Sequence, residues 1–197
     1  MSLAVYVLAG GVRGDVRSSE AGFKYLLLGG FASAFLLMGM ALLYGFAGGT
    51  AFSDISRALG EGGNDLGLAI LGGGLVLVGL GFKVAMVPFH MWTPDVYDGA
   101  PAYVTGFMAT AVKAAGFAIL IRFAWLMQPQ LAFAWYPVLA ALAVLTMTVG
   151  NLVALAQNSV KRLLAWLSIA HAGYLLLGVV TLISPADGGS AQMGVGR

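Results

Sequence analysis

GLGFKVAMVPFHMWTPDVYDGAP, residues 79–101, begins as an apolar helix that contains a lysine and is then interrupted by a proline. Lys83 lies in the apolar part, and Pro88 follows it within little more than one helical turn. Proline has no backbone N–H to donate, and its ring clashes with the carbonyl four residues earlier, here that of Val84. The stretch therefore predicts a broken helix beside a buried ammonium group.

The composition of the whole chain indicates a membrane protein. Of its 197 residues, 60% are hydrophobic and only 9% are charged, and the mean hydropathy is +0.91, whereas soluble domains carry about 25% charged residues. The net charge of +2 is small and the basic residues are scattered, which argues against a nucleic-acid partner. With no cysteine there is no disulfide or thiolate-held cluster, and two histidines argue against a zinc or haem site.

Five apolar runs reach the length of about 20 residues that a bilayer-crossing helix needs. They cover roughly residues 23–46, 67–87, 103–127, 137–156 and 162–183. A sixth run, from Met1 to about Val12, is too short to cross and has the character of the second half of a helix. We therefore expect an all-α membrane protein, a fragment of a longer chain, with about five full transmembrane helices plus a partial first one, and with one helix broken at Pro88.

The linkers between these runs predict the orientation in the membrane. Those on one side cover residues 12–22, 88–102 and 157–161, and those on the other cover residues 47–66, 128–136 and 184–197. The first side carries Arg13, Arg17, Lys24, Lys161 and Arg162, and the second carries Arg57, Arg122 and Arg197. Because basic residues are enriched on the cytoplasmic side, the first side is predicted to be cytoplasmic.

All the acidic residues lie in linkers or at the edges of the apolar runs, so the ionisable groups left at membrane depth are Lys83, Lys113 and His171. A charge at the bilayer centre costs at least about 2.5 kcal/mol, and such residues usually have a function. A buried lysine whose carboxylate partner moves can load and release a proton. The three residues are therefore candidates for proton transfer. The alternatives are lysines that snorkel in a purely structural scaffold and a neutral histidine bonded to a neighbour.

The other polar residues have simpler interpretations. Glu20 and Lys24 are spaced for an i,i+4 ion pair at the start of a span. The segment HMWTPDVYDGAP, residues 90–101, is predicted to be a loop because of its proline and glycine residues, with Asp95 as a candidate cap for the next helix. Lys161 and Arg162 are explained as topology anchors at the membrane surface.

Two long segments, GLGFKVAMVPFHMWTPDVYDGAPAYVTGFMATAVKAAGFAILIRF and NLVALAQNSVKRLLAWLSIAHAGYLLLG, resemble the antiporter-like membrane subunits of proton-translocating NADH–quinone oxidoreductase, respiratory complex I. The similarity is greatest to the subunit N type of the bacterial enzyme and extends from Met1 to about Ile183. The resemblance implies a fold of fourteen transmembrane helices with two inverted five-helix repeats. In that fold this chain would be a single transmembrane domain, with residues 1–127 as most of the first repeat and residues 128–197 as the start of the second.

The resemblance also implies roles for single residues. Lys83 matches the central proton-carrying lysine of the first half-channel, and Pro88 marks the break in its helix. Lys113 matches the connecting lysine on the next helix, and His171 matches a relay histidine. Lys24 matches a lysine with a secondary role. The glutamate that pairs with the central lysine in the family would fall before Met1, and the helices after the tenth are absent from this sequence.

The function implied by the resemblance is proton translocation in the membrane arm of the oxidoreductase. This chain would carry no redox centre, cofactor or metal, since NADH, FMN, iron–sulfur clusters and quinone would be handled by other subunits. Its partners would be other membrane-arm subunits and the lipid bilayer, in the bacterial inner membrane, with the 88–102 loop in the cytoplasm. The alternatives are a subunit of a multisubunit sodium–proton antiporter or of a membrane-bound hydrogenase, and a non-functional truncated membrane protein.

Overall fold

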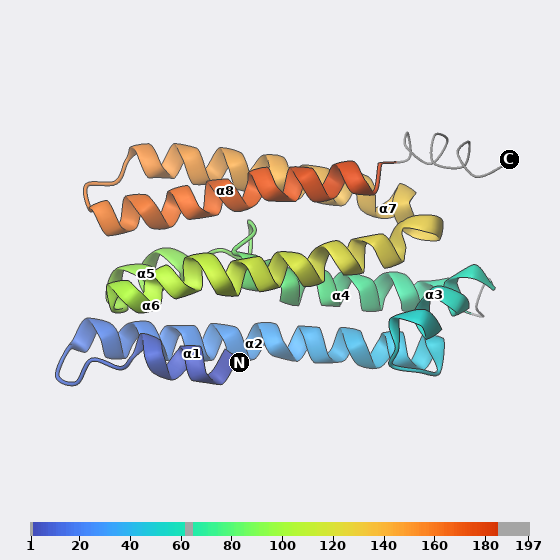
Figure 1. The fold of residues 1–197 in the computed structure, drawn as a ribbon, viewed down its shortest axis with the longest axis horizontal. Helices are drawn as coiled ribbons and strands as arrows, with labels where there is room; N and C mark the ends of the chain where they lie inside the picture. The colour runs from blue at the N-terminus through green and yellow to red at the C-terminus, as the bar shows by residue number, and fades with distance from the viewer. Residues whose placement is uncertain (1, 62–64, 185–197) are drawn as a thin grey trace, which may run out of the picture.

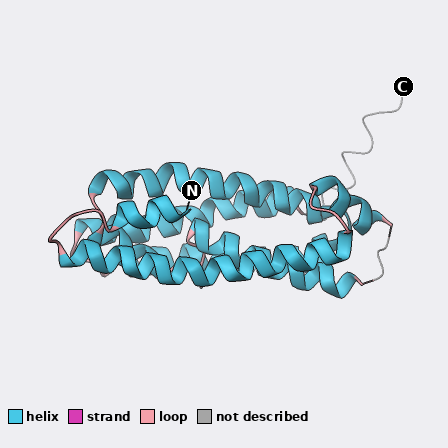
Figure 2. Cartoon of the chain, turned by 90° about the horizontal axis from the view of Figure 1, so that it is seen from below, coloured by secondary structure: helices cyan, strands magenta, loops and turns pink. Residues whose placement is uncertain are grey.

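A computed structural model of the chain describes residues 2–61 and 65–184, and all the regular structure in that part is helical (Figures 1 and 2). In chain order the elements are α1 (Ser2–Ala9), α2 (Val16–Ala47), α3 (Phe52–Gly60), α4 (Leu66–Val84), α5 (Trp92–Gly99), α6 (Ala102–Phe107), the π-helical turn η1 (Met108–Val112), α7 (Lys113–Leu155) and α8 (Val160–Leu182).

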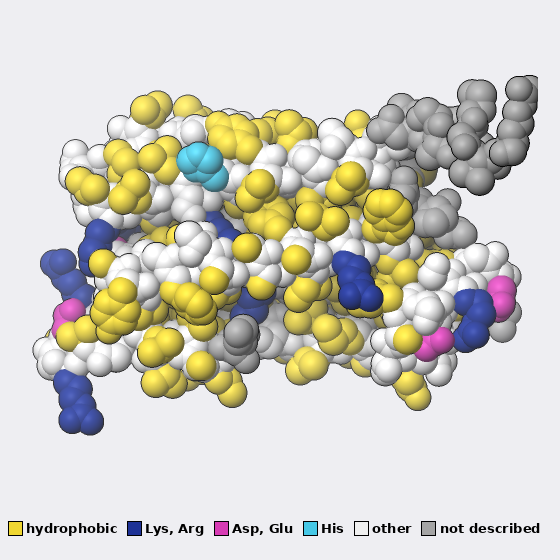
Figure 3. Space-filling view, in the orientation of Figure 1, with side chains coloured by type: hydrophobic (Ala, Val, Ile, Leu, Met, Phe, Trp, Pro, Cys, Tyr) yellow, Lys and Arg dark blue, Asp and Glu magenta, His cyan; other side chains and the backbone are white. Residues whose placement is uncertain are grey.

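Five helical segments are long and apolar enough to cross a membrane, and they confirm the five predicted spans. Their bounds are Val16–Ala47, Leu66–Val84, Ala102–Leu126, Leu131–Leu155 and Val160–Leu182. They run roughly parallel to the long axis of the molecule (Figure 1). On the face drawn in Figure 3, acidic side chains are visible only at the two ends of the bundle, whereas basic side chains also lie along its middle. This distribution agrees with the sequence, in which the charges at membrane depth are basic.

The helices form three layers in Figure 1. α1 packs on α2 in one outer layer, and α4 lies in the middle layer with α5, α6 and the first half of α7. The chain then reverses direction within α7, so that its second half pairs with α8 in the other outer layer. The predicted short run at the N-terminus is the short helix α1.

The predicted loop over residues 88–102 was wrong in part, because it contains the helix α5. Pro94 is the third residue of this helix, where no N–H has an intrahelical partner, so proline costs nothing there. The N–H of Ala100 ends the helix by donating to the carbonyl of Val96, 2.9 Å away. The proline and glycine residues thus mark the ends of a short helix.

Two other predicted linkers also contain helix. Within residues 47–66, α3 buries Ile55 and Leu59, which are one helical turn apart. Within residues 128–136, the helix of α7 continues and the next span begins at Leu131. The predicted loop over residues 184–197 lies outside the described residues except for Ser184.

The grouping of the linkers at opposite ends of the bundle is confirmed. The α1–α2 and α7–α8 connections and α5 lie at one end, and α3 lies at the other (Figure 1). Ion pairs and hydrogen bonds described below join the elements at the first end.

The α7–α8 pair depends on two glycines at which the helices touch. A Cβ atom on Gly150 would lie 2.6 Å from the backbone nitrogen of Ala170, and one on Gly173 would lie 2.7 Å from that of Met147. These distances are shorter than any normal contact, so only glycine allows the observed approach. Small residues at such positions let membrane helices pack closely.

We expect Gly150→Leu to weaken the α7–α8 pair, because the added side chain meets backbone that cannot move aside. Overpacking of this kind costs about 1–3 kcal/mol or more. Thermal unfolding in detergent measures the effect. Gly178→Leu is the matched control, since a Cβ at Gly178 of α8 meets nothing within 4 Å. An equal loss of stability in both variants would show that the close approach is not the cause.

Candidate functional site

The helix of Lys83 is broken as predicted, but it ends before Pro88 is reached. α4 stops at Val84, and Ala85 adopts a left-handed conformation with φ 61°. The N–H of Met86 donates to the carbonyl of Gly81, 2.9 Å away. The segment then passes through Pro88, whose peptide bond with Val87 is cis, before α5 begins at Trp92. In Figure 1 this connection projects from the middle layer toward α7 and α8.

Two side chains form hydrogen bonds with backbone groups that the break exposes, one from the distant second half of α7 and one from the short helix that follows the break. The N–H of Val87 donates to Oγ1 of Thr146 at 3.0 Å, and Thr146 is fully buried in the second half of α7. The indole N–H of Trp92 donates to the carbonyl of Phe82 at 3.0 Å. Because the membrane interior offers no bulk water, such bonds are what make a broken helix tolerable there. Neither partner was identified from the sequence.

Lys83 is in the last turn of α4 and contacts α1. Its Nζ donates to the hydroxyl of Tyr6 at 3.4 Å and lies 5.4 Å from the centre of the Tyr6 ring. Tyr6 also stacks edge-on against Tyr25 of α2, with the ring centroids 4.5 Å apart. The short N-terminal helix therefore supplies an aromatic hydroxyl to the predicted central lysine.

Lys113 is almost completely buried, with 6% of its surface exposed, and it contacts α8. Its Nζ donates to both the carbonyl and the hydroxyl oxygen of Ser168, each at 2.7 Å. The π-helical turn η1 ends immediately before it. Such turns disturb the regular backbone of a helix and are frequent at functional sites.

The two lysines come from helices in direct contact, yet their side chains diverge. A Cβ on Gly116, one turn after Lys113, would lie 3.7 Å from the Cβ of Lys83. From this contact Lys83 extends to α1 and Lys113 extends to α8. The structure therefore brings the backbones of the two predicted residues together and gives each ammonium group a different partner helix.

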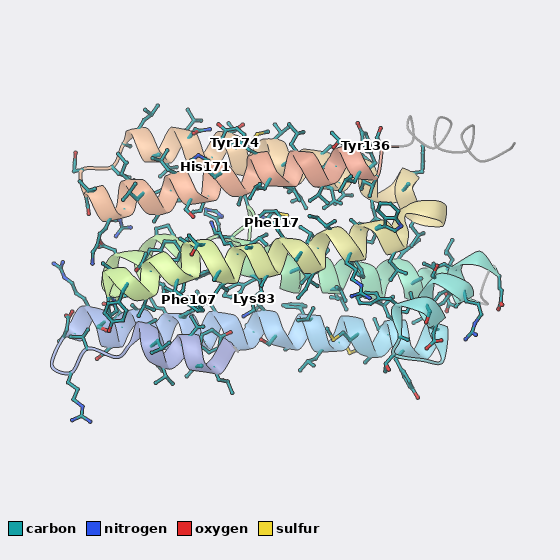
Figure 4. The ribbon with its side chains drawn as sticks, in the orientation of Figure 1. Lys83, Phe107, Phe117, Tyr136, His171 and Tyr174 are labelled. Carbon is teal, nitrogen blue, oxygen red and sulfur yellow. The ribbon has the colours of Figure 1, made fainter. Side chains whose placement is uncertain are left out.

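His171 lies apart from Lys83. It is exposed on α8, and Figure 4 shows it in the outer layer with Tyr174, whereas Lys83 lies between the middle layer and the layer of α2. Its Nδ1 is 2.8 Å from the carbonyl of Leu167 one turn earlier. A proton on Nδ1 would donate to this carbonyl and leave Nε2 as an acceptor. The nearby Tyr174 hydroxyl accepts a hydrogen bond from Asn151 at 2.8 Å.

Between α5, the break and α8, several buried polar atoms have no hydrogen-bond partner among the described residues. They are Nδ1 of His90, Oγ1 of Thr93, the hydroxyl of Tyr97 and Nε1 of Trp166. Burial raises the pKa of the Tyr97 hydroxyl, and the neighbouring Ser168, the partner of Lys113, opposes this shift. Unpaired buried polar atoms usually mark ordered water. Sequence analysis did not identify this cluster, because the burial of these atoms depends on how α5 packs against α8, and Trp166 is far from the other three along the chain.

Asp95 joins three elements at the end of the bundle and does not cap a helix as predicted. Its carboxylate lies 3.1 Å from Nζ of Lys24 in α2 and 3.3 Å from Arg162 in α8. Lys24 also pairs with Glu20 at 2.7 Å, as its spacing predicted. Arg162 is thus more than a topology anchor, because its ion pair with Asp95 links α8 to α5, the second half of the broken helix. These ion pairs are partly exposed, with about 40% of each partner's side chain accessible at the Arg162–Asp95 pair.

A charged cavity of about 350 Å³ opens beside Asp95. Its charged lining residues are Arg17, Glu20, Lys24, Asp95, Asp98 and Arg162. Lys161 adds a further link at this end by donating to the carbonyl of Asp98 at 3.2 Å. In the described part of the chain, no three His, Asp or Glu side chains are grouped so that they could hold a metal ion.

This fold and site define a membrane protein built on a broken helix with lysines inside its spans. A family of transmembrane proteins described as NADH:quinone oxidoreductase/Mrp antiporter matches residues 1–193, and the chain belongs to it. The family predicted from the sequence is therefore confirmed.

Individual relatives agree. NADH-quinone oxidoreductase subunit N of Trichlorobacter lovleyi is 51% identical, over 90% of this chain and 37% of its own length. A chain of respiratory complex I from Thermus thermophilus is 50% identical, with a TM-score of 0.75 over 91% of this chain and 38% of that one. A chain of an archaeal membrane-bound sulfane sulfur reductase is 29% identical, with a TM-score of 0.83 over 91% of this chain and 36% of that one. This chain thus spans well under half the length of these relatives.

We expect Thr146→Val to destabilise the break by leaving the buried N–H of Val87 without an acceptor. An unsatisfied buried donor costs about 1–3 kcal/mol. Thermal unfolding in detergent tests this against Thr110→Val, whose exposed hydroxyl bonds only to the carbonyl of Gly106 in its own helix. An equal loss of thermal stability in the two variants would show that the hydrogen bond from Val87 to Thr146 does not stabilise the break.

We expect Asp95 and Arg162 to be coupled in a double-mutant cycle built from Asp95→Asn and Arg162→Gln. Because the pair is partly exposed, the coupling should be at most about 1 kcal/mol and should shrink as salt screens it. Unfolding free energies at low and high salt measure it. Asp54 and Arg57, 3.3 Å apart on α3, form a comparison pair within one helix. No coupling between Asp95 and Arg162 at low salt would exclude this link between α5 and α8.

Proposed function

We propose that this chain forms part of a membrane-arm subunit of a proton-translocating NADH–quinone oxidoreductase and that protons pass through Lys83, Lys113 and His171. The observation that carries the proposal is the environment of Lys113. Its buried ammonium group bonds to two neutral oxygens of Ser168 and to no carboxylate among the described residues. Neutral oxygens orient the ammonium group by hydrogen bonds and attract it less strongly than a carboxylate would.

The broken helix supplies a way to couple the two ends of this path. Asp95 on α5 forms ion pairs with Lys24 of α2 and Arg162 of α8. Trp92 on the same short helix donates a hydrogen bond to the carbonyl of Phe82, the residue before Lys83. A shift of α5 would therefore change the backbone next to Lys83. The left-handed Ala85 and the connection through Pro88 would absorb this movement.

The partner-free polar atoms near Ser168 offer water sites between the break and Lys113. Trp166 and His90 have ring centroids 5.3 Å apart, and Tyr97 lies near Ser168. Water in this region could carry protons from the break toward Lys113. His171, one turn beyond Ser168 on α8, would pass them to the outer face of that helix, where Nε2 is free to accept.

The choice of NADH–quinone oxidoreductase over another respiratory membrane complex rests on sequence identity. Identity is 51% to a curated subunit N and 29% to the sulfane sulfur reductase chain, although the fold similarity to the latter is as high. We accordingly propose other membrane-arm subunits as partners, the bacterial inner membrane as the location, and the end with Asp95 as cytoplasmic. The same proposal divides the chain into two repeats at about residue 127 and gives Lys24 a secondary role. It also places the redox cofactors in other subunits.

We expect Lys113→Met to abolish or strongly reduce the number of protons translocated per NADH oxidised, because no other described side chain replaces its ammonium group at Ser168. The measurement uses the assembled oxidoreductase that contains this chain, reconstituted into proteoliposomes. Acidification of the lumen and NADH oxidation are recorded together.

Lys161→Met is the matched control, because that exposed lysine bonds only to backbone carbonyls at the end of the bundle. It should leave the ratio of protons to NADH unchanged. An unchanged ratio in Lys113→Met, in a complex that assembles normally, would refute the proposed role of Lys113.

A further inference from the structure

An apolar cavity of about 350 Å³ lies at the end of the bundle opposite Asp95. Four helices line it, namely α2, α3, α4 and α7. Its lining is almost entirely hydrophobic and includes Leu36, Met40, Val76, Leu80, Ile119 and Phe123. None of the residues proposed above for proton transfer lines it.

A second hollow adjoins this cavity and shares Phe52 with it. The hollow is lined by Phe52, Ala118, Ile121, Arg122, Trp125 and Leu126. The Cζ of Arg122 lies 4.7 Å from the centre of the Phe52 ring, which is a cation–π distance. A cation therefore lines the hollow next to the apolar cavity, in contact with Phe52, which lines both.

The charge of Arg122 is not matched by a carboxylate in the part of the chain that is described. Asp54, the acidic residue closest in sequence to Phe52, pairs with Arg57 at 3.3 Å. Asp65 caps α4 by accepting from the N–H of Leu68. Arg122 itself remains exposed to the surroundings of the bundle.

The depth of Arg122 in the membrane fits a lipid headgroup. It lies one turn from the end of the span Ala102–Leu126, and the exposed Trp125 follows it. Tryptophan at the end of a span is typical of the interface between headgroups and hydrocarbon. The apolar cavity reaches from this level toward the hydrocarbon core along α2 and α4.

We propose that this pair of hollows binds one anionic phospholipid, with its phosphate on Arg122 and an acyl chain in the apolar cavity. The positive charge of Arg122 complements the negative charge of such a lipid, and the hydrophobic lining complements its chain. The volume also favours a chain over a protein helix, because one turn of a helix of about 10 Å diameter already fills about 420 Å³. This inference is independent of the proposed proton path.

The test uses the purified protein in detergent with phosphatidylglycerol that carries a photoreactive diazirine on one acyl chain. After irradiation, mass spectrometry of the digested chain should locate the label on peptides containing Met40 or Phe123. Arg122→Gln should reduce labelling about tenfold, as expected for loss of a charge-assisted hydrogen bond. Arg57→Gln is the control, because it removes a cation at the same end of the bundle that does not line either hollow, and it should leave labelling unchanged.

A second variant tests the role of the apolar cavity independently of the charge on Arg122. Met40→Trp should fill part of the cavity and suppress labelling with Arg122 intact, and it should fold because Met40 is about half exposed. A probe with a phosphatidylcholine headgroup should label the wild-type protein several-fold less. Equal labelling by the two lipids, or labelling that survives Arg122→Gln, would overturn the proposal. Absence of labelling in the wild type would also overturn it and would favour a protein helix as the occupant.

Discussion

The structure depends on one constraint. Inside the membrane there is no bulk water to form hydrogen bonds with the backbone, so each backbone N–H and carbonyl group needs a partner within the protein. A helix that stops at Val84 exposes N–H and carbonyl groups that would be costly in lipid. Thr146 and Trp92 remove this cost from two directions, one from α7 and one from the short helix that follows. The break can therefore persist next to Lys83 only because the three layers of helices close around it.

The same arrangement gives Lys83 and Lys113 different hydrogen-bond partners, although their backbones lie close together where α4 packs against α7. Lys83 meets the aromatic hydroxyl of Tyr6, and Lys113 meets the serine oxygens of Ser168. Both partners belong to outer layers, so each lysine links the middle layer to a different side of the bundle. Movement of one outer layer relative to the middle would therefore affect one lysine more than the other.

The two ends of the bundle have different chemistry. The end with Asp95 carries interlocked charges from α2, α5 and α8, and these hold the second half of the broken helix. The opposite end has an apolar cavity, and Arg122 lines the hollow beside it. The first end is therefore charged and cross-linked by ion pairs, whereas the second is apolar and is the place where we propose that a lipid binds.

The sequence by itself determined the membrane class, the five spans, the break near Pro88 and the lysines inside the spans, because hydrophobic length and proline chemistry are local properties. Even the pair of Glu20 and Lys24 followed from helical spacing. Tertiary structure alone decided which groups meet. Asp95 with Arg162, Val87 with Thr146, and Lys113 with Ser168 are each separated by more than fifty residues. Contacts of this kind depend on how whole helices pack, and close approaches such as that of Gly150 to Ala170 set that packing.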